Sequence, residues 1–522
     1  MIAGNLIHRV NVGDILRRTS SRYPNHIAVQ EGERQYTYRE FNEIVNQAAN
    51  GLKSIGLKRG DRLALISSNS IEFLQIYFAC AKTGITIIPI NLSLLTHEVA
   101  YILEDSSAKA LIIEDTQAYQ LEELSQIATL QTAIVIGNVC SNENQYADWF
   151  SLYSNQKGTE VISEVTDRDL MQCLYTSGTT SNPKGVMSSH LAVYMNTLGT
   201  AFDLQFTSND ISIAMLPMHH VAQLNAITTP VMMAGGTVVI MKKFEPIELM
   251  VLIEKVGATQ IFGLPMMYRT LLDHPERSNY DLSTLRLCVY AMAVMPDHEI
   301  KRAIETFQCD FALLFGQTEM APVATVFRPE HQLTKSGSVG LSGVNVDVAI
   351  MDENGRVLPT GEIGEIVYRS PQVMEGYLND QAKTEEAFQH EWFHSGDYGY
   401  LDEDAILWFI DRKKDMVKTG GVNVASMEVE KVIFQNPRVD NVAVVGMPHT
   451  HWTEALTAFV IPKEGETVTE EEIIALCKKQ LGGYKVPKKV LIVDEFPVTS
   501  TGKIQKHALR KMYSELYVEI QN

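Results

Sequence analysis

A run of hydroxyl side chains that ends in a lysine is the part of the sequence best suited to chemistry. Residues 174–185 read Leu-Tyr-Thr-Ser-Gly-Thr-Thr-Ser-Asn-Pro-Lys-Gly and follow an apolar stretch. In such a run the glycine lets backbone N–H groups approach anionic oxygens, the hydroxyls donate hydrogen bonds, and the lysine supplies positive charge. The candidate phosphate-binding residues are therefore Thr176, Ser177, Gly178, Thr179, Thr180 and Lys184.

This segment differs from the P-loop of nucleoside triphosphatases. In that motif the lysine is followed by serine or threonine at the start of a helix, whereas Gly185 and Val186 follow here. From the spacing alone, a surface turn without a ligand explains the segment as well as a phosphate site does.

The size and charge of the chain exclude several classes of function. The chain has 522 residues and a formal net charge of −19. A chain of this length divides into more than one domain. The excess of carboxylates repels phosphate backbones, which disfavours nucleic acid as a partner and tight docking on anionic lipid.

The sequence predicts no signal peptide and no transmembrane segment. The most apolar region, residues 63–95, contains Glu72 and Lys82 and is therefore expected to form buried strands and a helix. The six cysteines are far apart, with no pair at metal-ligand spacing. This favours a reducing cytoplasm, with the thiols buried as small apolar groups.

Apolar runs alternate with helical stretches through the first three hundred residues. Strands are expected at residues 62–67, 86–90, 234–240, 259–262 and 285–290, with helices at 38–55 and 73–82. This alternation predicts crossover units and a mostly parallel sheet. From about Ser338 the strands become shorter. After the charged run 411–415, the last 110 or so residues are predicted to form a small α+β unit.

The loop at residues 174–185 closely resembles the phosphate-binding loop of the adenylate-forming superfamily, which includes acyl-CoA synthetases, firefly luciferase and peptide-synthetase adenylation domains. The resemblance covers nearly the whole chain. It implies an α/β fold in which residues 1–410 form a large N-terminal adenylation domain, with mixed, mostly parallel sheets and a distorted β-barrel subdomain. Residues 411–522 would form a small, mobile α+β C-terminal domain with its hinge at Asp411.

Two further motifs of the larger domain appear in the order of that superfamily. Leu216-Pro-Met-His-His220 is similar to the segment that places an aromatic residue or histidine at the acyl pocket, which makes His220 the candidate gate. Phe315-Gly-Gln-Thr-Glu319 resembles the motif whose aromatic ring stacks on adenine. The resemblance implies that Thr318 contacts the α-phosphate and carboxylate, and that Glu319 and Thr176 bind Mg²⁺, a cation that prefers oxygen ligands.

The remaining motifs lie toward the C-terminal end. The resemblance implies that Asp397, in Trp-Phe-His-Ser-Gly-Asp, binds the ribose hydroxyls and that Arg412 makes a second ribose contact. Gly420 and Gly421 match the passage for pantetheine. Lys503, in Pro-Val-Thr-Ser-Thr-Gly-Lys, matches the lysine that bridges the substrate carboxylate and the α-phosphate.

One turn departs from the pattern of the superfamily. The Gly-Gly-Ala-Pro turn beside adenine is replaced by Ala291-Met-Ala-Val294. Both glycines and the proline are missing, so the packing around adenine and the shape of the acyl pocket are expected to differ.

Together, these motifs predict an ATP-dependent acyl-CoA ligase that uses ATP, Mg²⁺ and coenzyme A. It would be an acid–thiol ligase that forms an acyl-adenylate, releases pyrophosphate and then makes the thioester. The alternatives are a ligase that loads a carrier protein, a non-enzymatic nucleotide-binding relative, and an oxygenase of the luciferase type. A homodimer is left open by the sequence.

The acid is expected to be a fatty or other apolar acid, with an aryl or carnitine-type acid as the alternative. Residues 220–225 contain no acidic side chain that could pair with an α-amino group. The expected pocket segments are also rich in methionine, which adapts to flexible apolar ligands, although the same residues could simply fill a core. They are Met215, Met218, Met266, Met267, Met292, Met295 and Met320.

Overall fold

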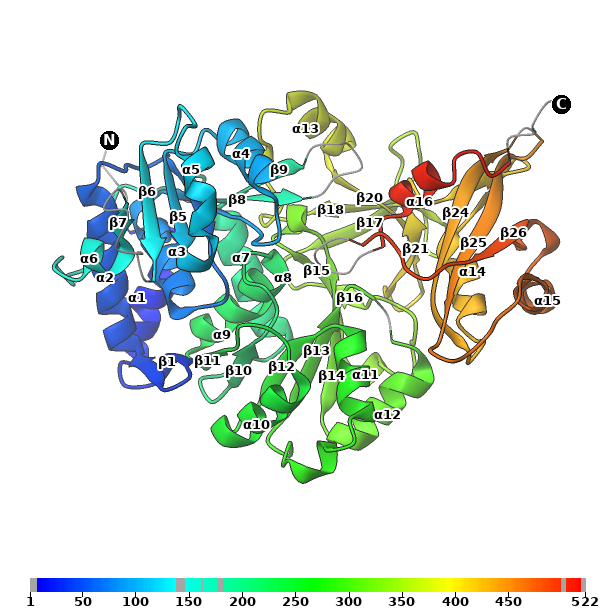
Figure 1. Cartoon of the computed structure of the whole chain (residues 1–522), viewed down its shortest axis with the longest axis horizontal. Coiled ribbons are helices and arrows are strands. Elements are labelled where there is room, and N and C mark those ends of the chain that lie inside the picture. Colours follow the sequence, from blue (N-terminus) through cyan, green and yellow to red (C-terminus); the bar gives the residue numbers. More distant parts are fainter. Residues whose placement is uncertain are drawn as a thin grey trace. The chain divides into compact units, whose positions relative to one another are not determined.

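A computed structural model describes residues 7–137, 146–161, 163–176, 183–293, 295–449, 451–498 and 504–517 (Figure 1). The chain divides into two compact units. The first comprises Met1–Val348 and Tyr368–Phe393, and the second comprises Ala349–Val367 and His394–Asn522. The second unit thus includes residues 349–367 and 394–410 together with those after residue 411, and the expected domain boundary at residue 411 stays a prediction. A boundary of motion is a different property, and a hinge at Asp411 therefore stays a prediction.

The larger unit contains a nine-stranded sheet in the described part of the chain. Its centre is parallel, and antiparallel pairs form both of its edges. The helices α10, α11 and α12 pack along this sheet (Figure 1). The strands, in spatial order, are β16 (Leu341–Ser342), β15 (Val323–Phe327), β14 (Asp310–Gly316), β13 (Leu287–Ala291), β12 (Gln260–Gly263), β10 (Ile211–Ala214), β11 (Thr237–Ile240), β1 (Ile27–Glu31) and β2 (Arg34–Thr37).

A second sheet of the larger unit has eight strands among the described residues. Five of its pairs are parallel, and β9 runs antiparallel to both of its neighbours, β8 and β19. The strands, in spatial order, are β19 (Gly376–Tyr377), β9 (Lys184–Ser189), β8 (Leu170–Thr176), β4 (Thr86–Pro89), β3 (Arg62–Ile66), β5 (Ala110–Glu114), β6 (Thr132–Ile136) and β7 (Ala147–Asp148).

The helices follow local sequence signals. Helix α2 starts at a capping box formed by Thr37 and Glu40, and α3 starts where the Ser70 hydroxyl accepts a hydrogen bond from the Phe73 N–H. Helix α3 is mostly apolar and is buried at every position except Glu72, as expected for a helix inside a core. The helices of the larger unit are α1 (Gly13–Arg22), α2 (Tyr38–Ser54), α3 (Ile71–Thr83), α4 (Thr96–Asp105), α5 (Leu121–Leu124), α6 (Trp149–Tyr153), α7 (His190–Asp203), α8 (Val221–Gln223), the π-helix η2 (Leu224–Thr228), α9 (Thr229–Ala234), α10 (Pro246–Val256), α11 (Pro265–Asp273), α12 (Asp297–Phe307) and α13 (Gln381–Ala387).

One hydrophobic core joins the two sheets of the larger unit. It includes Leu65 of β3, Phe78 of α3 and Val289 of β13, all fully buried. Helices α1 to α3 contribute to the same core, so residues far apart in the sequence form one rigid support. The predicted strands and helices of this region are confirmed to within a few residues.

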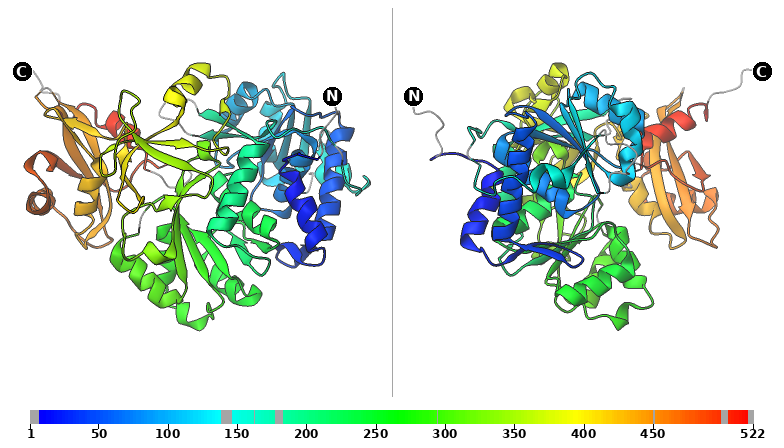
Figure 2. Two further views of the ribbon diagram at one scale, coloured as in Figure 1. Left: turned by 180° about the vertical axis from the view of Figure 1, so that it is seen from behind. Right: turned by 60° about the vertical axis from the view of Figure 1, so that its left-hand side comes forward.

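The smaller unit contains an α+β module. Four of its strands are antiparallel and a fifth, β26 (Lys489–Ile492), runs parallel to β25 (Thr453–Pro462). Its remaining elements are β22 (Val417–Thr419), β23 (Val422–Val424), β24 (Val439–His449), α14 (Ser426–Ile433), α15 (Glu470–Gln480) and α16 (Lys506–Met512). The orange strands and the red helix α16 lie side by side in all three views (Figure 1, Figure 2).

The expected barrel is an open sheet over the residues that the structure describes. It has the order β17 (Asp347–Met351), β18 (Gly364–Arg369), β20 (Phe393–Leu401) and β21 (Leu407–Arg412). The α/β class and the mixed sheets are confirmed. Across the described ranges, none of the helices combines the length and apolar character needed to cross a membrane. The cysteines that the structure describes are all buried thiols, as predicted.

Candidate active site

The predicted phosphate loop begins and ends on one antiparallel pair of strands. Thr176, the last residue of β8, is the register partner of Lys184, the first residue of β9. Strand pairing therefore holds the two ends of the segment beside each other. Ser177, Gly178, Thr179 and Thr180 lie outside the described residues, so their predicted contacts stay predictions.

Lys184 lies among both cations and carboxylates. Burial and the nearby Lys383 lower the pKa of its ammonium group, against the opposing effect of Asp380 and Glu319. Its Nζ atom lies 5.1 Å from the centre of the Tyr377 ring, within range of a cation–π interaction. The ammonium group is thus partly desolvated, which strengthens its attraction for an anion.

The candidate metal ligand Glu319 lies in a short 3₁₀ turn, η4 (Thr318–Met320), just beyond strand β14. The chain reaches this turn through Gly316, whose φ is 156°. A Cβ atom on Gly316 would lie 2.0 Å from the carbonyl oxygen of Pro322. Only glycine fits there, and this is why the Phe315 and Glu319 motif needs that residue.

A segment that the sequence analysis did not identify holds the Glu319 turn. The Met374 N–H donates to the Glu319 carbonyl oxygen at 2.7 Å, and Gln372 Nε2 donates to the Met320 carbonyl oxygen at 2.9 Å. Tyr377 Oη donates to the Glu319 carboxylate atom Oε1 at 2.9 Å. Tyr377 therefore contacts both Lys184 and Glu319, two residues separated by 135 positions of sequence that were predicted to bind the same phosphate chain.

The Glu319 carboxylate suits Mg²⁺ as a protein ligand. Over the described ranges, no three His, Cys, Asp or Glu side chains gather as a protein-only metal site. Mg²⁺ commonly uses one or two carboxylates together with substrate phosphates and water. A partly exposed carboxylate oriented by one hydrogen bond fits that pattern, whereas a role for the Thr176 hydroxyl stays a prediction.

The candidate gate His220 precedes an unusual helix. The His220 N–H donates to the Pro217 carbonyl oxygen at 3.1 Å, and α8 then passes directly into the π-helix η2. Single π turns often occur at functional sites. Burial and the neighbouring His220 lower the pKa of His219 to about 3, so the His219 ring is neutral near pH 7.

The altered turn after β13 keeps a backbone shape that favours glycine. Met292 has a φ of 74°, and the residue is 41% exposed. In the parallel register Ala291 pairs with Leu314, so Met292, just after β13, and Phe315, near the end of β14, lie at adjacent strand ends. Ligands of open α/β sheets bind at such carboxyl ends of strands.

The predicted pocket methionines differ in exposure. Met215, Met218, Met295 and Met320 are buried, whereas Met266 and Met292 are exposed. The buried members therefore belong to the core at least in part, and a substrate-lining role stays a prediction.

In the smaller unit, the two predicted ribose ligands lie opposite each other. Asp397 of β20 is the register partner of Arg412 of β21, and Arg412 Nε lies 3.8 Å from Asp397 Oδ1. The Asp397 side chain is 13% exposed and that of Arg412 is 46% exposed. The structure therefore brings together two residues that the sequence could only propose separately.

Gly420 and Gly421 form a tight turn beside an aromatic ring. Their φ values are 56° and 82°, and the Gly420 N–H donates to the Trp452 carbonyl oxygen at 3.0 Å. The Lys488 Nζ atom lies 4.6 Å from the centre of the Trp452 ring. The sequence analysis missed both Trp452 and Lys488, since neither stands in a recognisable motif. Lys503 lies outside the described residues.

Comparison with known families accounts for both units. The model of the AMP-binding enzyme family matches residues 16–378, and that of the AMP-binding enzyme C-terminal domain matches residues 428–503. The chain belongs to the AMP-binding enzyme family.

Relatives within this family are similar over nearly their whole length. A feruloyl-CoA synthase from Amycolatopsis sp is 32% identical over 496 residues, which are 95% of this chain and 98% of the relative. The long-chain-fatty-acid–CoA ligase FadD13 of Mycobacterium tuberculosis is 32% identical over 518 residues, 97% of this chain and 99% of FadD13. The crystal structure of the anthranilate CoA ligase AuaEII in complex with anthranoyl-AMP has a TM-score of 0.88 and 28% identity, covering 98% of this chain and 99% of that chain.

These relatives confirm the predicted class of enzyme. This AMP-binding enzyme is an AMP-forming acyl-CoA ligase. The names of the relatives refer to acids of different chemical types, so the family alone does not identify the acid used by this chain. The individual site residues likewise stay predictions.

Proposed function

We propose that this ligase activates an apolar carboxylic acid, with fatty acids as the first choice. The observation that carries the proposal is the segment after His220. Residues 221–228, which form α8 and η2, are all buried and contain no ionisable side chain. An α-ammonium group bound there would lack a counter-charge, and burying it unpaired would be costly. Buried Met215 and Met218 lie on the adjoining segment and add adaptable apolar surface.

In the first half-reaction, a carboxylate oxygen of the acid attacks the α-phosphorus of ATP and pyrophosphate leaves. Lys184 and the hydroxyls of the 176–180 segment hold the β- and γ-phosphates. Thr318 contacts the α-phosphate and the acid, and Lys503 bridges both. The role of this chain is thus to position the reactants and neutralise charge.

Bound Mg²⁺ supplies positive charge at the phosphate oxygens. Glu319 is its proposed protein ligand, with Thr176 as a second. Tyr377 orients Glu319 through the Oη hydrogen bond and leaves the other carboxylate oxygen for the cation. Phe315 stacks on adenine, and Asp397 with Arg412 binds the ribose hydroxyls.

In the second half-reaction, the sulfur of coenzyme A loses its proton and attacks the acyl carbonyl carbon, and AMP leaves. Rotation of the C-terminal domain about Asp411 replaces Lys503 by the pantetheine passage at Gly420 and Gly421. Trp452 and Lys488 offer an aromatic face and a cation close to that passage, which suit the adenine and phosphates of coenzyme A. Transfer to a carrier protein is the alternative.

The test is pyrophosphate release from MgATP with a panel of acids, each with and without coenzyme A. The panel runs from acetate to palmitate and includes benzoates, carnitine and amino acids. We expect turnover that depends on coenzyme A with medium or long fatty acids and its loss in Lys503→Ala. Fastest turnover with benzoates, carnitine or amino acids would refute the apolar fatty-acid proposal. Release that never requires coenzyme A would instead support carrier loading.

A further inference from the structure

Two basic side chains attach helix α16 to the residues around Asp411. Lys506 and Arg510 are four positions apart and so lie on one face of the helix. Lys506 Nζ donates to Ser426 Oγ at 2.6 Å and lies 2.8 Å from Glu430 Oε1. Arg510 lies 3.2 Å from Asp415 Oδ1 and also donates to the Lys414 carbonyl oxygen at 3.4 Å.

The Ser426 hydroxyl carries this connection on to Asp411. It donates to Asp411 Oδ2 at 2.6 Å, and the same carboxylate oxygen accepts the Ser426 N–H at 2.6 Å and the Met427 N–H at 3.3 Å. Helix α14 follows Ala425, which has no side-chain acceptor, so Asp411 caps the helix from a distant strand. Asp411 Oδ1 accepts the Arg412 N–H at 2.8 Å. The Asp411 side chain is therefore bonded to α14 while its backbone belongs to β21.

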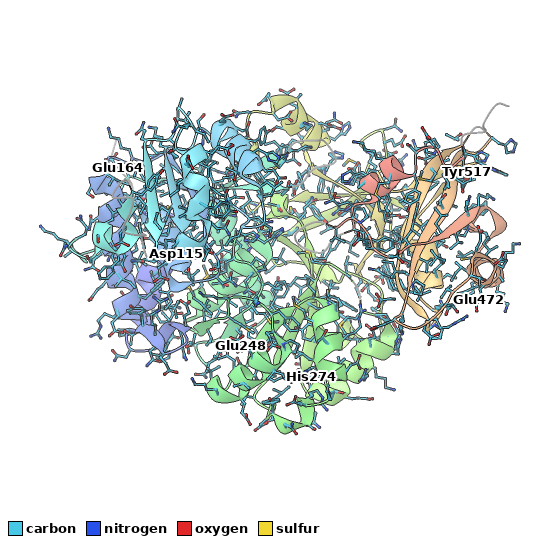
Figure 3. The ribbon with its side chains drawn as sticks, viewed as in Figure 1. Asp115, Glu164, Glu248, His274, Glu472 and Tyr517 are labelled. Carbon is cyan, nitrogen blue, oxygen red and sulfur yellow. The ribbon has the colours of Figure 1, made fainter. Side chains whose placement is uncertain are left out.

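The carboxylate of Glu430 is the second partner of the Lys506 ammonium group. Besides Lys506 it accepts the Val444 N–H at 2.7 Å, and its side chain is only 13% exposed. Aromatic contacts hold the chain beyond Arg510: the Tyr513 ring lies 4.8 Å from Phe459, and Tyr517, labelled in Figure 3, is hydrogen-bonded to Thr457 at 3.0 Å. Charged groups thus anchor α16, and aromatic contacts anchor the residues that follow it.

We propose that Lys506 is a positioning residue for the adenylation half-reaction, because it ties α16 through Ser426 to the hinge carboxylate Asp411 and through Glu430 to helix α14. Lys506 is the first residue of α16 and stands three residues after Lys503 in the sequence, so α16 is the helix nearest to Lys503 along the chain. The proposal rests on the proposed roles of Lys503 and Asp411. It adds that the hinge residue and helix α16 move as one body, and it assigns this coupling to the contacts of Lys506 with Ser426 and Glu430.

The first test compares Lys506→Met with Lys506→Arg in the full chain. Adenylation is measured as pyrophosphate exchange with MgATP and the best acid of the panel. Thioester formation is measured separately, from chemically prepared acyl-AMP and coenzyme A. We expect Lys506→Met to slow adenylation by up to about 100-fold, the scale of a misplaced reacting group, while thioester formation from acyl-AMP changes little. Lys506→Arg should restore most of the rate, because a guanidinium can donate to both Ser426 and Glu430.

A matched control is a second lysine that pairs with a glutamate of helix α14. Lys485 lies 2.6 Å from Glu428 of α14, in an ion pair that reaches neither Asp411 nor α16. Lys485→Met should keep both half-reactions within about twofold of wild type. Hydrogen exchange gives a readout independent of activity: Lys506→Met should speed amide exchange in residues 504–517, and Lys485→Met should not.

The outcomes separate this inference from the proposed function. Adenylation by Lys506→Met at the rate of Lys485→Met would overturn the inference. Equal loss of both half-reactions, or no rescue by arginine, would also overturn it, since a general structural role predicts those results. If Lys503→Ala keeps full adenylation, the proposed function itself is wrong, whatever Lys506→Met does.

Discussion

Glu319 and Asp411 are both carboxylates at the junction of a strand and a turn, but the chain surrounds them differently. Among the described residues, Glu319 has one side-chain donor, the Tyr377 hydroxyl, and is partly exposed. Asp411 is 2% exposed, and its two oxygens accept four hydrogen bonds from Arg412, Ser426 and Met427. A carboxylate that binds a cation must keep an oxygen accessible, whereas one that anchors a helix is used fully by its own chain. The number of hydrogen bonds that a carboxylate accepts from its own chain thus distinguishes a ligand-binding acid, with few, from a structural acid, with many.

The largest effect is expected for Glu319→Gln. The amide keeps the size of the side chain and can accept the Tyr377 hydrogen bond, but it loses the charge that attracts Mg²⁺. We expect adenylation to fall by about 1000-fold with no change in the melting temperature. Glu375→Gln, two residues before Tyr377, removes only the ion pair with Arg168 and should leave the rate unchanged. A large loss of stability in Glu319→Gln would show that this acid is structural after all.

Asp411→Ala should show the opposite pattern. Removing the carboxylate leaves the N–H groups that start α14 without an acceptor, and we expect a loss of about 3 kcal/mol in the free energy of unfolding of the smaller unit. Urea denaturation measures this loss. The exposed Asp440→Asn serves as the control and should be neutral. If Asp411→Ala is as stable as the control, the four hydrogen bonds contribute little to the free energy of unfolding of the smaller unit.

Asp210 is a structural carboxylate of the larger unit. It therefore tests whether the difference between Glu319 and Asp411 comes from the unit in which each acid lies or from its immediate surroundings. It belongs to the larger unit, is 2% exposed and pairs with Arg286 at 2.6 Å. Burial raises the pKa of Asp210, but the bonds from Arg286, Thr207 and Thr259 outweigh it and hold the pKa below its ordinary value of 3.8. Its stabilisation is therefore complete above the ordinary pKa and is lost as the pH falls through the lower, folded-state value.

We expect Asp210→Asn to cost about 2 kcal/mol near neutral pH. The difference from wild type should shrink as the pH falls below about 4. Denaturant melts at pH 7, 5 and 3 would follow it. A difference that stays constant over this range would mean that the charge of Asp210 contributes nothing.

The smallest effect is expected at Met292, near the functional edge of the larger unit. A methionine with a φ of 74° is strained by about 1–2 kcal/mol, so Met292→Gly should raise the stability by about 1 kcal/mol. Met266→Gly, at an exposed position in helix α11, should instead lower it by about 1 kcal/mol. Thermal melts of both variants would decide. Equal losses would show that the backbone at Met292 is not under strain.

The sequence predicted the parts of the fold that depend on local pattern. Strands such as β3 and helices such as α3 follow from apolar runs and caps over a few residues. The barrel subdomain was expected from the resemblance alone, but the described chain has an open sheet there. The sequence could not predict this, because no local pattern shows whether the edge strands of a sheet pair with each other. The sequence also did not predict that the chain passes from the first unit to the second and back, because this depends on contacts between residues far apart in the sequence.

The candidate site shows a similar division. Lys184, Glu319 and Asp397 stand in motifs, so the sequence could propose them. Tyr377 was missed because its role depends on β19 pairing with β9, a contact between residues about 190 positions apart. Lys506 was missed because its importance lies in a chain of hydrogen bonds through Ser426, which only the folded backbone assembles.

The interleaved units have a consequence for how the protein is made. Residues 349–367 belong to the second unit but leave the ribosome before residues 368–393, which complete the first. Domains tend to fold as their residues emerge, from the N-terminus onward. The strand β18 therefore emerges before β20 and β21 have been synthesised, and its segment must wait for residues 394–412 before its sheet can form. A gene truncated after residue 410 would still encode β20 and most of β21, but it would remove both Asp411 and the helix α14 that Asp411 caps. We expect the truncated protein to expose its open sheet of β17, β18, β20 and β21. It should therefore need chaperones that the full-length chain does not need.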